Sequence, residues 1–260
     1  MAHRIRNHKR SLIRLGAALF RVRSFTLVPL AVALLVTPWL VPGDPARSAP
    51  LLAVGGILLA AGAAVRFHVS GLSPRGTSTR GTTIGAARLV TSGCYAHCRN
   101  PLYVANACLW VGAACLTGLP FLPLAVLAVV AAQYFAIVFA EETYLRRKFG
   151  ETFDAYCRHV PRFRPRLTPW AGRSEPLPFG WKRAVFKEHD SLFGTAALAV
   201  LIVLPSAFRA APSAGLIDAW YGGFAGLAVV WLAAKALKHQ DAKARRTAES
   251  VGTNATLTGV

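Results

Sequence analysis

The sequence predicts an all-α integral membrane protein of about six transmembrane helices, with a helical hairpin and a polar site on its cytoplasmic face. Hydrophobic residues make up 54% of the 260 positions, uncharged stretches long enough to cross a bilayer recur along the chain, and basic residues concentrate between them. A formal charge of +19 would also suit a nucleic-acid-binding protein, but such proteins do not separate their basic residues by long apolar runs. We therefore expect membrane lipid, and no nucleic acid, around this chain.

A basic segment at residues 1–24 precedes the first apolar run. It is similar in charge to the start of a signal peptide, but the run after it is long and has no clear small-residue cleavage site, so we expect the segment to be retained. Its arginines can form an amphipathic helix on anionic lipid or act as an ordinary topology signal. The topology signal is favoured.

The apolar runs account for six spans. Four stretches approach the roughly 20 residues that cross a hydrocarbon core. They are residues 25–42, 49–65, 191–208 and 216–234, the last of which is charged only at Asp218. The uncharged run from Leu102 to Ala140 is too long for one crossing, and Gly118-Leu119-Pro120 interrupts it where a turn is needed. That run is predicted to form a tight hairpin of two helices.

The distribution of basic residues predicts the orientation. Of the 30 lysine and arginine residues, all but Arg47 and Arg209 fall on one side of this topology. The positive-inside rule makes that side cytoplasmic, and both termini lie on it. The predicted organisation is a cytoplasmic segment at 1–24, a membrane core at 25–166, a cytoplasmic linker at 167–190, two further transmembrane helices at 191–234 and a cytoplasmic tail at 235–260.

The five cysteines form neither a CxxC pair nor an even set, so free thiols are expected rather than a disulfide framework. Cys94, His97 and Cys98 are close in sequence, but no second cluster completes a four-ligand metal site. No metal site is predicted.

Polar residues concentrate in two cytoplasmic segments that flank the hairpin, residues 88–103 and 141–166. A hairpin brings its two ends together. We therefore expect Arg99 and Tyr103 to lie near Glu141 and Glu142 at the membrane surface.

These two segments resemble the isoprenylcysteine carboxyl methyltransferase and phospholipid methyltransferase superfamily, membrane enzymes that use S-adenosylmethionine. The first block is Ser92-Gly93-Cys94-Tyr95 and then Arg99-Asn100-Pro101-Leu102-Tyr103, similar to G-x-Y and R-H-P-x-Y. The second block is Glu141-Glu142 with Leu145, Phe149-Gly150, Phe153, Tyr156 and Val160-Pro161-Arg162-Phe163, similar to E-E-x-x-L, F-G-x-x-(Y/F)-x-x-Y and V-P-R-F. The family often has His where this chain has Asn100, which hydrogen-bonds but cannot carry a proton as imidazole can.

The resemblance implies methyl transfer from S-adenosylmethionine to a lipophilic acceptor. The candidate cofactor-binding residues are Tyr95, Arg99, Asn100, Tyr103, Glu141, Glu142 and Tyr156, and the candidate catalytic residues are Arg99 and Glu142. An arginine suits the donor's carboxylate, a glutamate suits its ammonium or ribose hydroxyls, and tyrosine rings attract a cation. Arg99 can instead anchor a helix start, and the glutamates can merely end a helix. With only 11 acidic residues in the chain, the functional interpretation is favoured.

Several alternatives stay open. The acceptor can be an isoprenylcysteine-like carboxylate, a lipid amine or a hydrophobic thiol, and an amine would need a base, for which Glu142 is the candidate. Leu145, Phe149, Phe153 and Tyr156 form a helical stripe that suits packing better than cofactor contact. The protein can also be a non-catalytic membrane scaffold of the same fold or a membrane NAD(P)H-dependent reductase. The last two helices lie beyond the resemblance and are expected to be structural or regulatory.

Overall fold

The computed structural model describes residues 2–23, 25–41, 45–72, 84–86, 88–175, 178–210 and 214–257. Within these ranges all regular secondary structure is helical and there is no strand, which confirms the predicted all-α class. The α-helices are α1 (Ala2–Val22), α2 (Val28–Leu40), α3 (Pro45–Leu72), α4 (Pro101–Cys115), α5 (Leu122–His159), α6 (Trp181–Ala210) and α7 (Ala214–Leu257), and a 3₁₀ helix, η1, covers Gly93–Ala96. Much of the predicted cytoplasmic segment between α3 and η1, at residues 73–83, lies outside the described residues.

Four of these helices, α3, α5, α6 and α7, are long and apolar enough to cross a membrane. Two others, α2 and α4, coincide with predicted spans but are only 13 and 15 residues long, against the roughly 20 that cross a hydrocarbon core. The described part of the chain thus has the character of a membrane protein with four long apolar helices. The count of six crossings stays a prediction.

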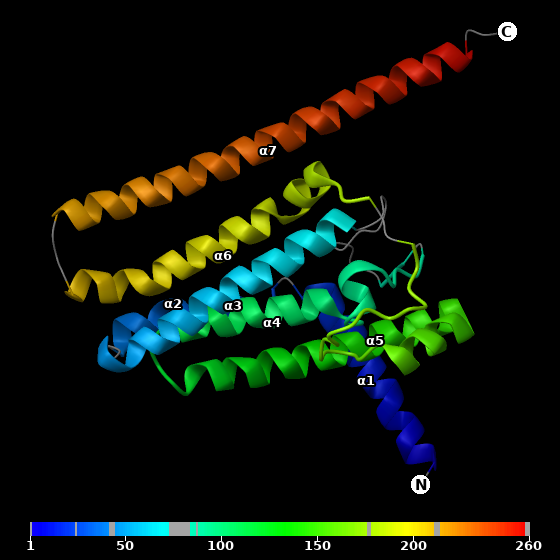
Figure 1. The fold of residues 1–260 in the computed structure, drawn as a ribbon, viewed down its shortest axis with the longest axis horizontal. Helices are drawn as coiled ribbons and strands as arrows, with labels where there is room; N and C mark the ends of the chain where they lie inside the picture. Colours follow the sequence, from blue (N-terminus) through cyan, green and yellow to red (C-terminus); the bar gives the residue numbers. More distant parts are fainter. Residues whose placement is uncertain are drawn as a thin grey trace.

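The helices form a row in which each packs on the next, in the order α5, α4, α3, α6 and α7, while α2 packs on α6 and α1 crosses α5 (Figure 1). The turn between α4 and α5 and the C-terminal end of α6 lie at one end of the row. The other end carries η1, the C-terminal end of α5 and the start of α6. The segments flanking the α4–α5 hairpin, which carry the sequence motifs, therefore gather at one end of the molecule.

The predicted hairpin consists of α4 and α5, joined through Leu116–Phe121. Gly118 has a φ of 75°, a backbone conformation that glycine adopts without steric cost. The Thr117 hydroxyl donates to the Ala114 carbonyl at 2.7 Å and so satisfies one of the acceptors left open at the end of α4. Pro123 lies in the first turn of α5, where its missing N–H costs nothing.

Two close helix contacts depend on glycine. In the α3–α4 contact, a Cβ on Gly55 would lie 2.8 Å from the Gly112 carbonyl oxygen, and a Cβ on Gly112 would lie 2.9 Å from that of Gly55. In the α1–α5 contact, a Cβ on Gly16 would overlap the Ala136 carbonyl oxygen. Small residues let helix backbones approach this closely, which is a common basis of helix association in membranes.

Gly150 divides α5 into two helical parts. Its φ of 52° and ψ of −128° break the helix, so residues 151–159 run in a new direction. The second part packs through Phe153 and Tyr156 onto Val160, with Trp170 at the edge of this cluster. Phe153 and Tyr156 of the predicted helical stripe thus pack in this cluster, and the preference for packing over cofactor contact stays a prediction.

Two boundaries differ from those expected from hydropathy. The helix α6 begins at Trp181, within the predicted 167–190 linker, and α7 continues to Leu257, within the predicted tail. Hydropathy predicts which part of a helix is apolar enough to lie in lipid. The helix itself can continue beyond the apolar part, through residues with charged side chains. The consequence is that the polar start of α6 is an ordered part of the fold.

Candidate functional site

A cavity of about 1070 Å³ opens among α1 to α6 and the segment before η1. It is at the upper end of the roughly 300–1,000 Å³ typical of small-molecule sites, so it has room for a cofactor and part of a second molecule. All seven predicted site residues contribute to its lining: Tyr95, Arg99, Asn100, Tyr103, Glu141, Glu142 and Tyr156. The structure thus brings the two sequence blocks together, and the roles assigned to their side chains stay predictions.

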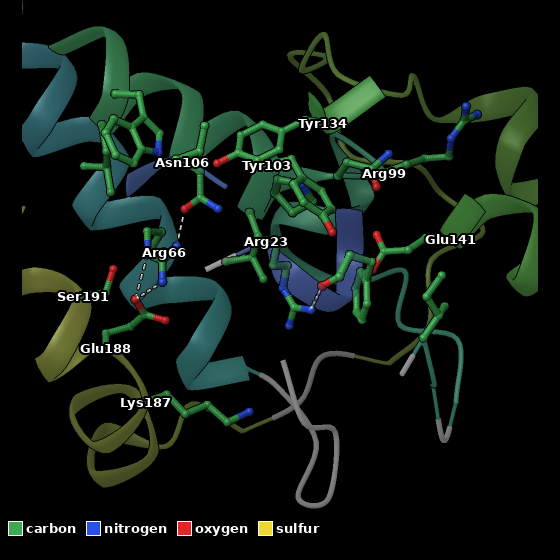
Figure 2. Close-up of a pocket in the computed structure, with 18 of the residues that line it drawn as sticks. Arg23, Arg66, Arg99, Tyr103, Asn106, Tyr134, Glu141, Lys187, Glu188 and Ser191 are labelled. Carbon is green, nitrogen blue, oxygen red and sulfur yellow. Dashed lines mark hydrogen bonds and ion pairs between the residues drawn. The ribbon is translucent and has the colours of Figure 1, made fainter. Parts of the chain in front are cut away.

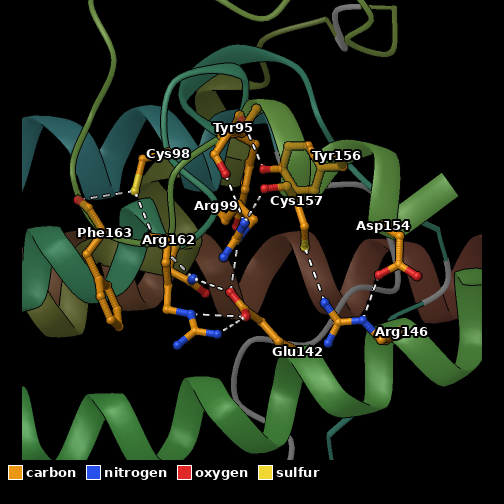
Figure 3. A network of polar contacts seen from close by, with 12 residues as sticks. Tyr95, Cys98, Arg99, Glu142, Arg146, Asp154, Tyr156, Cys157, Arg162 and Phe163 are labelled. Carbon is orange, nitrogen blue, oxygen red and sulfur yellow. Dashed lines mark hydrogen bonds and ion pairs between the residues drawn. The ribbon is translucent and has the colours of Figure 1, made fainter. Parts of the chain in front are cut away.

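Glu142 lies at the centre of an ionic network at the edge of the cavity (Figure 3). Its Oε1 accepts hydrogen bonds from Arg99 Nε at 3.1 Å and Asn100 Nδ2 at 3.3 Å. Its Oε2 accepts from Arg162 Nε at 3.0 Å and from Arg162 Nη2 at 2.6 Å. The glutamate is only 4% exposed, so two guanidinium groups stabilise a carboxylate that is almost out of contact with water.

Arg99 also holds the end of α5. Its Nη1 donates to the carbonyl oxygens of Cys157 at 2.9 Å and Val160 at 3.0 Å, which lie at and just beyond the C-terminus of α5. The last carbonyls of a helix lack partners within it and carry partial negative charge, so a guanidinium is a favourable partner there. Arg99 therefore joins the first sequence block to the second through both its charge and its donors.

Asn100 stands where the superfamily that the motifs resemble often has histidine, and its contacts show what an amide does at this position. Its Nδ2 donates both to Glu142 and to the Arg162 carbonyl oxygen, the latter at 3.1 Å. An amide group has two N–H donors on one nitrogen, whereas a neutral imidazole has one donor in total. Asn100 thus holds the Glu142 carboxylate and the Arg162 carbonyl oxygen in place, and its amide group does not titrate.

Residues 161–175, which we name the strap, run back beside the first block after α5 ends. Backbone N–H groups of Arg166 and Trp170 donate to the carbonyls of His97 and Ala96, each at 3.0 Å. Farther along, the Ser174 N–H donates to Thr91 Oγ1 at 2.7 Å. The strap therefore fixes the loop that carries Tyr95 and Arg99.

The two tyrosines nearest the strap are well anchored. The Tyr156 hydroxyl donates to the Tyr95 carbonyl oxygen at 2.7 Å, and its ring lies 5.7 Å from that of Trp170. Burial raises the pKa of the Tyr95 phenol further above neutral pH. Tyr95 also lines the cavity, whereas the Tyr156 hydroxyl is already engaged with protein.

Glu141 has different surroundings, because it points into the cavity (Figure 2). Its carboxyl group lies near the Tyr103 hydroxyl and within the field of the Arg23 guanidinium. The Tyr103 ring packs on that of Tyr134, with centroids 5.0 Å apart. We name Glu141, Tyr103, Tyr134 and Arg23 the carboxylate end of the cavity, in which one carboxyl group lies beside two aromatic rings and one guanidinium.

A second polar cluster lies across the cavity and includes residues that were not predicted from the sequence (Figure 2). Arg66 Nε donates to Glu188 Oε2 at 2.8 Å, the Ser70 hydroxyl donates to Glu188 Oε1 at 2.6 Å, and Arg66 Nη1 donates to Asn106 Oδ1. Glu188 is 4% exposed and belongs to α6. The scarcity of acidic residues, which singled out Glu141 and Glu142, could also have singled out Glu188. We name Arg66, Ser70, Asn106 and Glu188 the α6 cluster.

The cysteines complete the description of the site. All five are free thiols, and burial raises the pKa of Cys94 and of Cys98 in the first block. The Cys98 thiol donates to the Arg162 and Phe163 carbonyl oxygens, both at 3.4 Å. Within the ranges that the structure describes, no three His, Cys, Asp or Glu side chains lie close enough to share a metal ion.

Comparison with known proteins supports the resemblance read from the motifs. Residues 50–152 match the phospholipid methyltransferase family model, which confirms the suspected superfamily over this region. The matched region holds most of α3, η1, α4 and α5 up to just beyond its kink.

Two curated relatives align with about a third of the chain. The nickel-cobalt-cadmium resistance protein NccN of Alcaligenes xylosoxydans xylosoxydans is 38% identical over 92 residues, which are 35% of this chain and 43% of the relative. The cobalt-zinc-cadmium resistance protein CzcN of Cupriavidus metallidurans is 41% identical over 90 residues, 33% of this chain and 39% of the relative. The chain thus spans about two fifths of each relative's length. No solved structure matches the chain significantly.

Proposed function

We propose that this chain, which matches the phospholipid methyltransferase family over residues 50–152, is an integral membrane methyltransferase that moves a methyl group from S-adenosylmethionine to a lipophilic acceptor. The observation that carries the proposal is that the matched region supplies the part of the cavity wall that contains the sequence motifs. Six of the seven predicted site residues lie both in the match and in the cavity lining, and only Tyr156 lies outside the match. The four long apolar helices support the membrane location.

The carboxylate end of the cavity is the proposed donor site. When bound, S-adenosylmethionine supplies an electrophilic methyl group on a cationic sulfur. Glu141 would bind the donor's ammonium or ribose hydroxyls, and the rings of Tyr103 and Tyr134 would face its positive charge. The Tyr95 hydroxyl would donate to a donor oxygen. The side chains assigned here, Glu141, Tyr103, Tyr134 and Tyr95, all line the cavity.

Arg99 and Glu142 are proposed to act by position. Their predicted catalytic role stays a prediction, but each is engaged with protein partners, Glu142 through four hydrogen bonds and Arg99 through Glu142 and two carbonyls. Holding reactants in a productive geometry can supply about 7–11 kcal/mol of a barrier. Such positioning needs a rigid site. The contacts of Arg99 and Glu142 would provide it by holding the strap, the first block and the C-terminus of α5 in fixed places.

The acceptor would come from the membrane. Its reacting atom is a carboxylate oxygen, an amine nitrogen or a thiol sulfur, and the apolar part of the cavity lining suits a lipophilic molecule in each case. For a carboxylate or thiolate, charge is lost as the methyl group moves, so a water-poor cavity would favour transfer.

Calorimetry on detergent-solubilised protein tests the proposal. The intact chain should bind S-adenosylmethionine and not NADPH. Glu141→Gln removes a charge-assisted contact worth about 1.5–3 kcal/mol, so donor affinity should fall at least about tenfold. Glu151→Gln, an exposed position farther along α5, is the matched control and should bind like the wild type.

Other outcomes separate the alternatives. Binding of NADPH in place of S-adenosylmethionine would identify a reductase. Binding of neither by folded protein would favour a non-catalytic scaffold and contradict the proposal.

A further inference from the structure

The cavity extends from the carboxylate end into an apolar arm between α2 and α6. The arm is lined by Leu27, Val28, Ala31 and Leu35 at and after the start of α2, and by Gly194, Ala197, Leu198 and Leu201 on α6. The lining positions recur every three or four residues on each helix, as expected for one face. Both helices lie outside residues 50–152, so this arm is built by parts of the chain that the family match does not include.

The far end of the arm is closed by direct contact. Leu34 and Ile202 are each only 1% exposed and belong to one hydrophobic cluster, and Arg209 Nη2 donates to the Pro38 carbonyl at 2.8 Å. The outer face of α2 carries exposed Val32 and Val36, which suit contact with lipid. The arm therefore runs within the apolar layer of the protein.

The near end of the arm is polar. On α6, the lining begins with four polar residues, Lys187, Glu188, Asp190 and Ser191, and from Gly194 to Leu201 it is apolar except for Thr195. Because α6 rises 1.5 Å per residue, this face covers about 20 Å from Glu188 to Leu201. A polar cluster followed by a long apolar face matches an amphiphile whose head lies at the α6 cluster and whose hydrocarbon chain lies along the arm.

Gly194 keeps the arm open. A Cβ at this position would meet no atom within 4 Å, so the glycine is not required by a helix contact in the described structure. Glycine inside a helix costs roughly 1 kcal/mol relative to alanine. A glycine that lines a cavity without packing against another helix leaves space that a ligand can fill.

We propose that the arm between α2 and α6 binds the hydrocarbon chain of the acceptor, and that Gly194 provides the room for it. The α6 cluster lies where the polar head of the same molecule would be. The claim that the arm binds a hydrocarbon chain depends only on the residues that line it. The claim that this chain belongs to the methyl acceptor rests on the proposed function. The helix α6 is thereby part of the binding site.

The test uses a fatty acid with a photoreactive diazirine in its hydrocarbon chain and the full-length protein in nanodiscs. Irradiation should label peptides from the facing parts of α2 and α6. Gly194→Leu fills the arm from α6, and Ala31→Phe fills it from α2, so each should lower labelling of these peptides roughly tenfold, the scale on which apolar pockets discriminate. Gly222→Leu on α7 is the matched control, because its Cβ also meets no atom within 4 Å and it does not line the cavity.

Calorimetry with S-adenosylmethionine on the same samples separates this inference from the proposed function. Loss of labelling with unchanged donor affinity in both arm variants supports the inference and shows that the variants are folded. Undiminished labelling in both variants, or labelling spread evenly over the lipid-facing surface of α7, overturns it even if the donor binds. Labelling that behaves as expected in a protein that binds no donor supports the chain site and contradicts methyl transfer.

Discussion

At the scale of residues, adjacent glutamates have different tasks because successive helical side chains point about 100° apart. Glu141 faces the cavity beside Tyr103, whereas Glu142 is enclosed by Arg99 and Arg162. In the proposed function Glu141 binds a ligand, whereas Glu142 holds the strap and the first block together through its ion pairs. The same residue type at neighbouring positions would then serve binding in one case and structure in the other.

Removal of the enclosed carboxylate should be costly. Glu142→Ala leaves the Arg99 and Arg162 guanidinium groups without their shared partner, and breaking a buried ion pair from one side costs about 3–5 kcal/mol of unfolding free energy. Thermal unfolding of detergent-solubilised protein measures the effect. Arg146→Ala, which removes an ion pair with Asp154 that is exposed on both sides, should cost no more than about 1 kcal/mol. Equal losses in the two variants would contradict the structural role given to Glu142.

The residues that line the cavity could be predicted from the sequence, whereas most of the hydrogen bonds and ion pairs that they form could not. The motif order and the hairpin predicted that Arg99, Tyr103, Glu141 and Glu142 converge, and all line one cavity. Which glutamate faces the cavity depends on helix rotation, which hydropathy does not report. The Arg66–Glu188 pair joins residues 122 positions apart, and its formation depends on how α6 packs on α3.

At the scale of elements, the contact between α1 and α5 links the amphipathic N-terminal helix to the site. Gly16 allows this contact, and Phe20 near the end of α1 is buried in the main hydrophobic cluster. Arg23, just after α1, then lies near Glu141. The basic N-terminal segment, predicted mainly as a topology signal, therefore also packs against the membrane helices.

Gly16→Val should displace α1 from α5. The added side chain overlaps the Ala136 backbone, and such overpacking typically costs about 1–3 kcal/mol. We expect a lower unfolding temperature and weaker binding of S-adenosylmethionine, because Arg23 moves with the end of α1. Gly56→Val on α3 is the control, since a Cβ there meets no atom within 4 Å. The α1 contact would be dispensable if both variants unfolded at the wild-type temperature.

The elements were largely predictable, and the exceptions share a cause. Apolar runs and Gly118-Leu119-Pro120 located the hairpin, because a long uncharged run must fold back to stay in a bilayer. The interruption at Gly150 was also predicted, because glycine commonly breaks a helix. The early start of α6 at Trp181 and the continuation of α7 to Leu257 occur in polar sequence, where hydropathy does not report where a helix begins or ends. Tertiary contacts decide the helix ends there.

At the scale of the whole molecule, the ends of the helices sort into two groups. The sequence motifs lie at the end that carries η1 and the start of α6, and the α4–α5 turn lies at the other (Figure 1). The strongly basic connecting segments belong to the first group. The positive-inside rule then predicts that this end faces the cytoplasm.

Labelling of introduced cysteines checks that orientation. In a variant whose five native cysteines are replaced, Arg173→Cys in the strap should react with a membrane-impermeant maleimide only from the cytoplasmic side. Gly215→Cys, at the start of α7, should react only from the opposite side. Labelling of both from one side would contradict the predicted arrangement of α6 and with it the count of six crossings.

The strap also has a consequence for the order in which the protein is made. The loop with Arg99 is hydrogen-bonded to residues as late as Ser174, through the Thr91 contact, and about 75 further residues must be synthesised after Arg99 before the strap exists. At roughly 5–20 residues per second, this takes about 4–15 s. For most of that interval Arg99 lacks Arg162 and the carbonyl partners at the end of α5, because these lie 58 to 63 residues farther along the chain. Water is then expected to solvate the nascent site until the strap is made, and a ribosome that stalls before Arg162 would leave Arg99 and Glu142 without the third member of their ionic network.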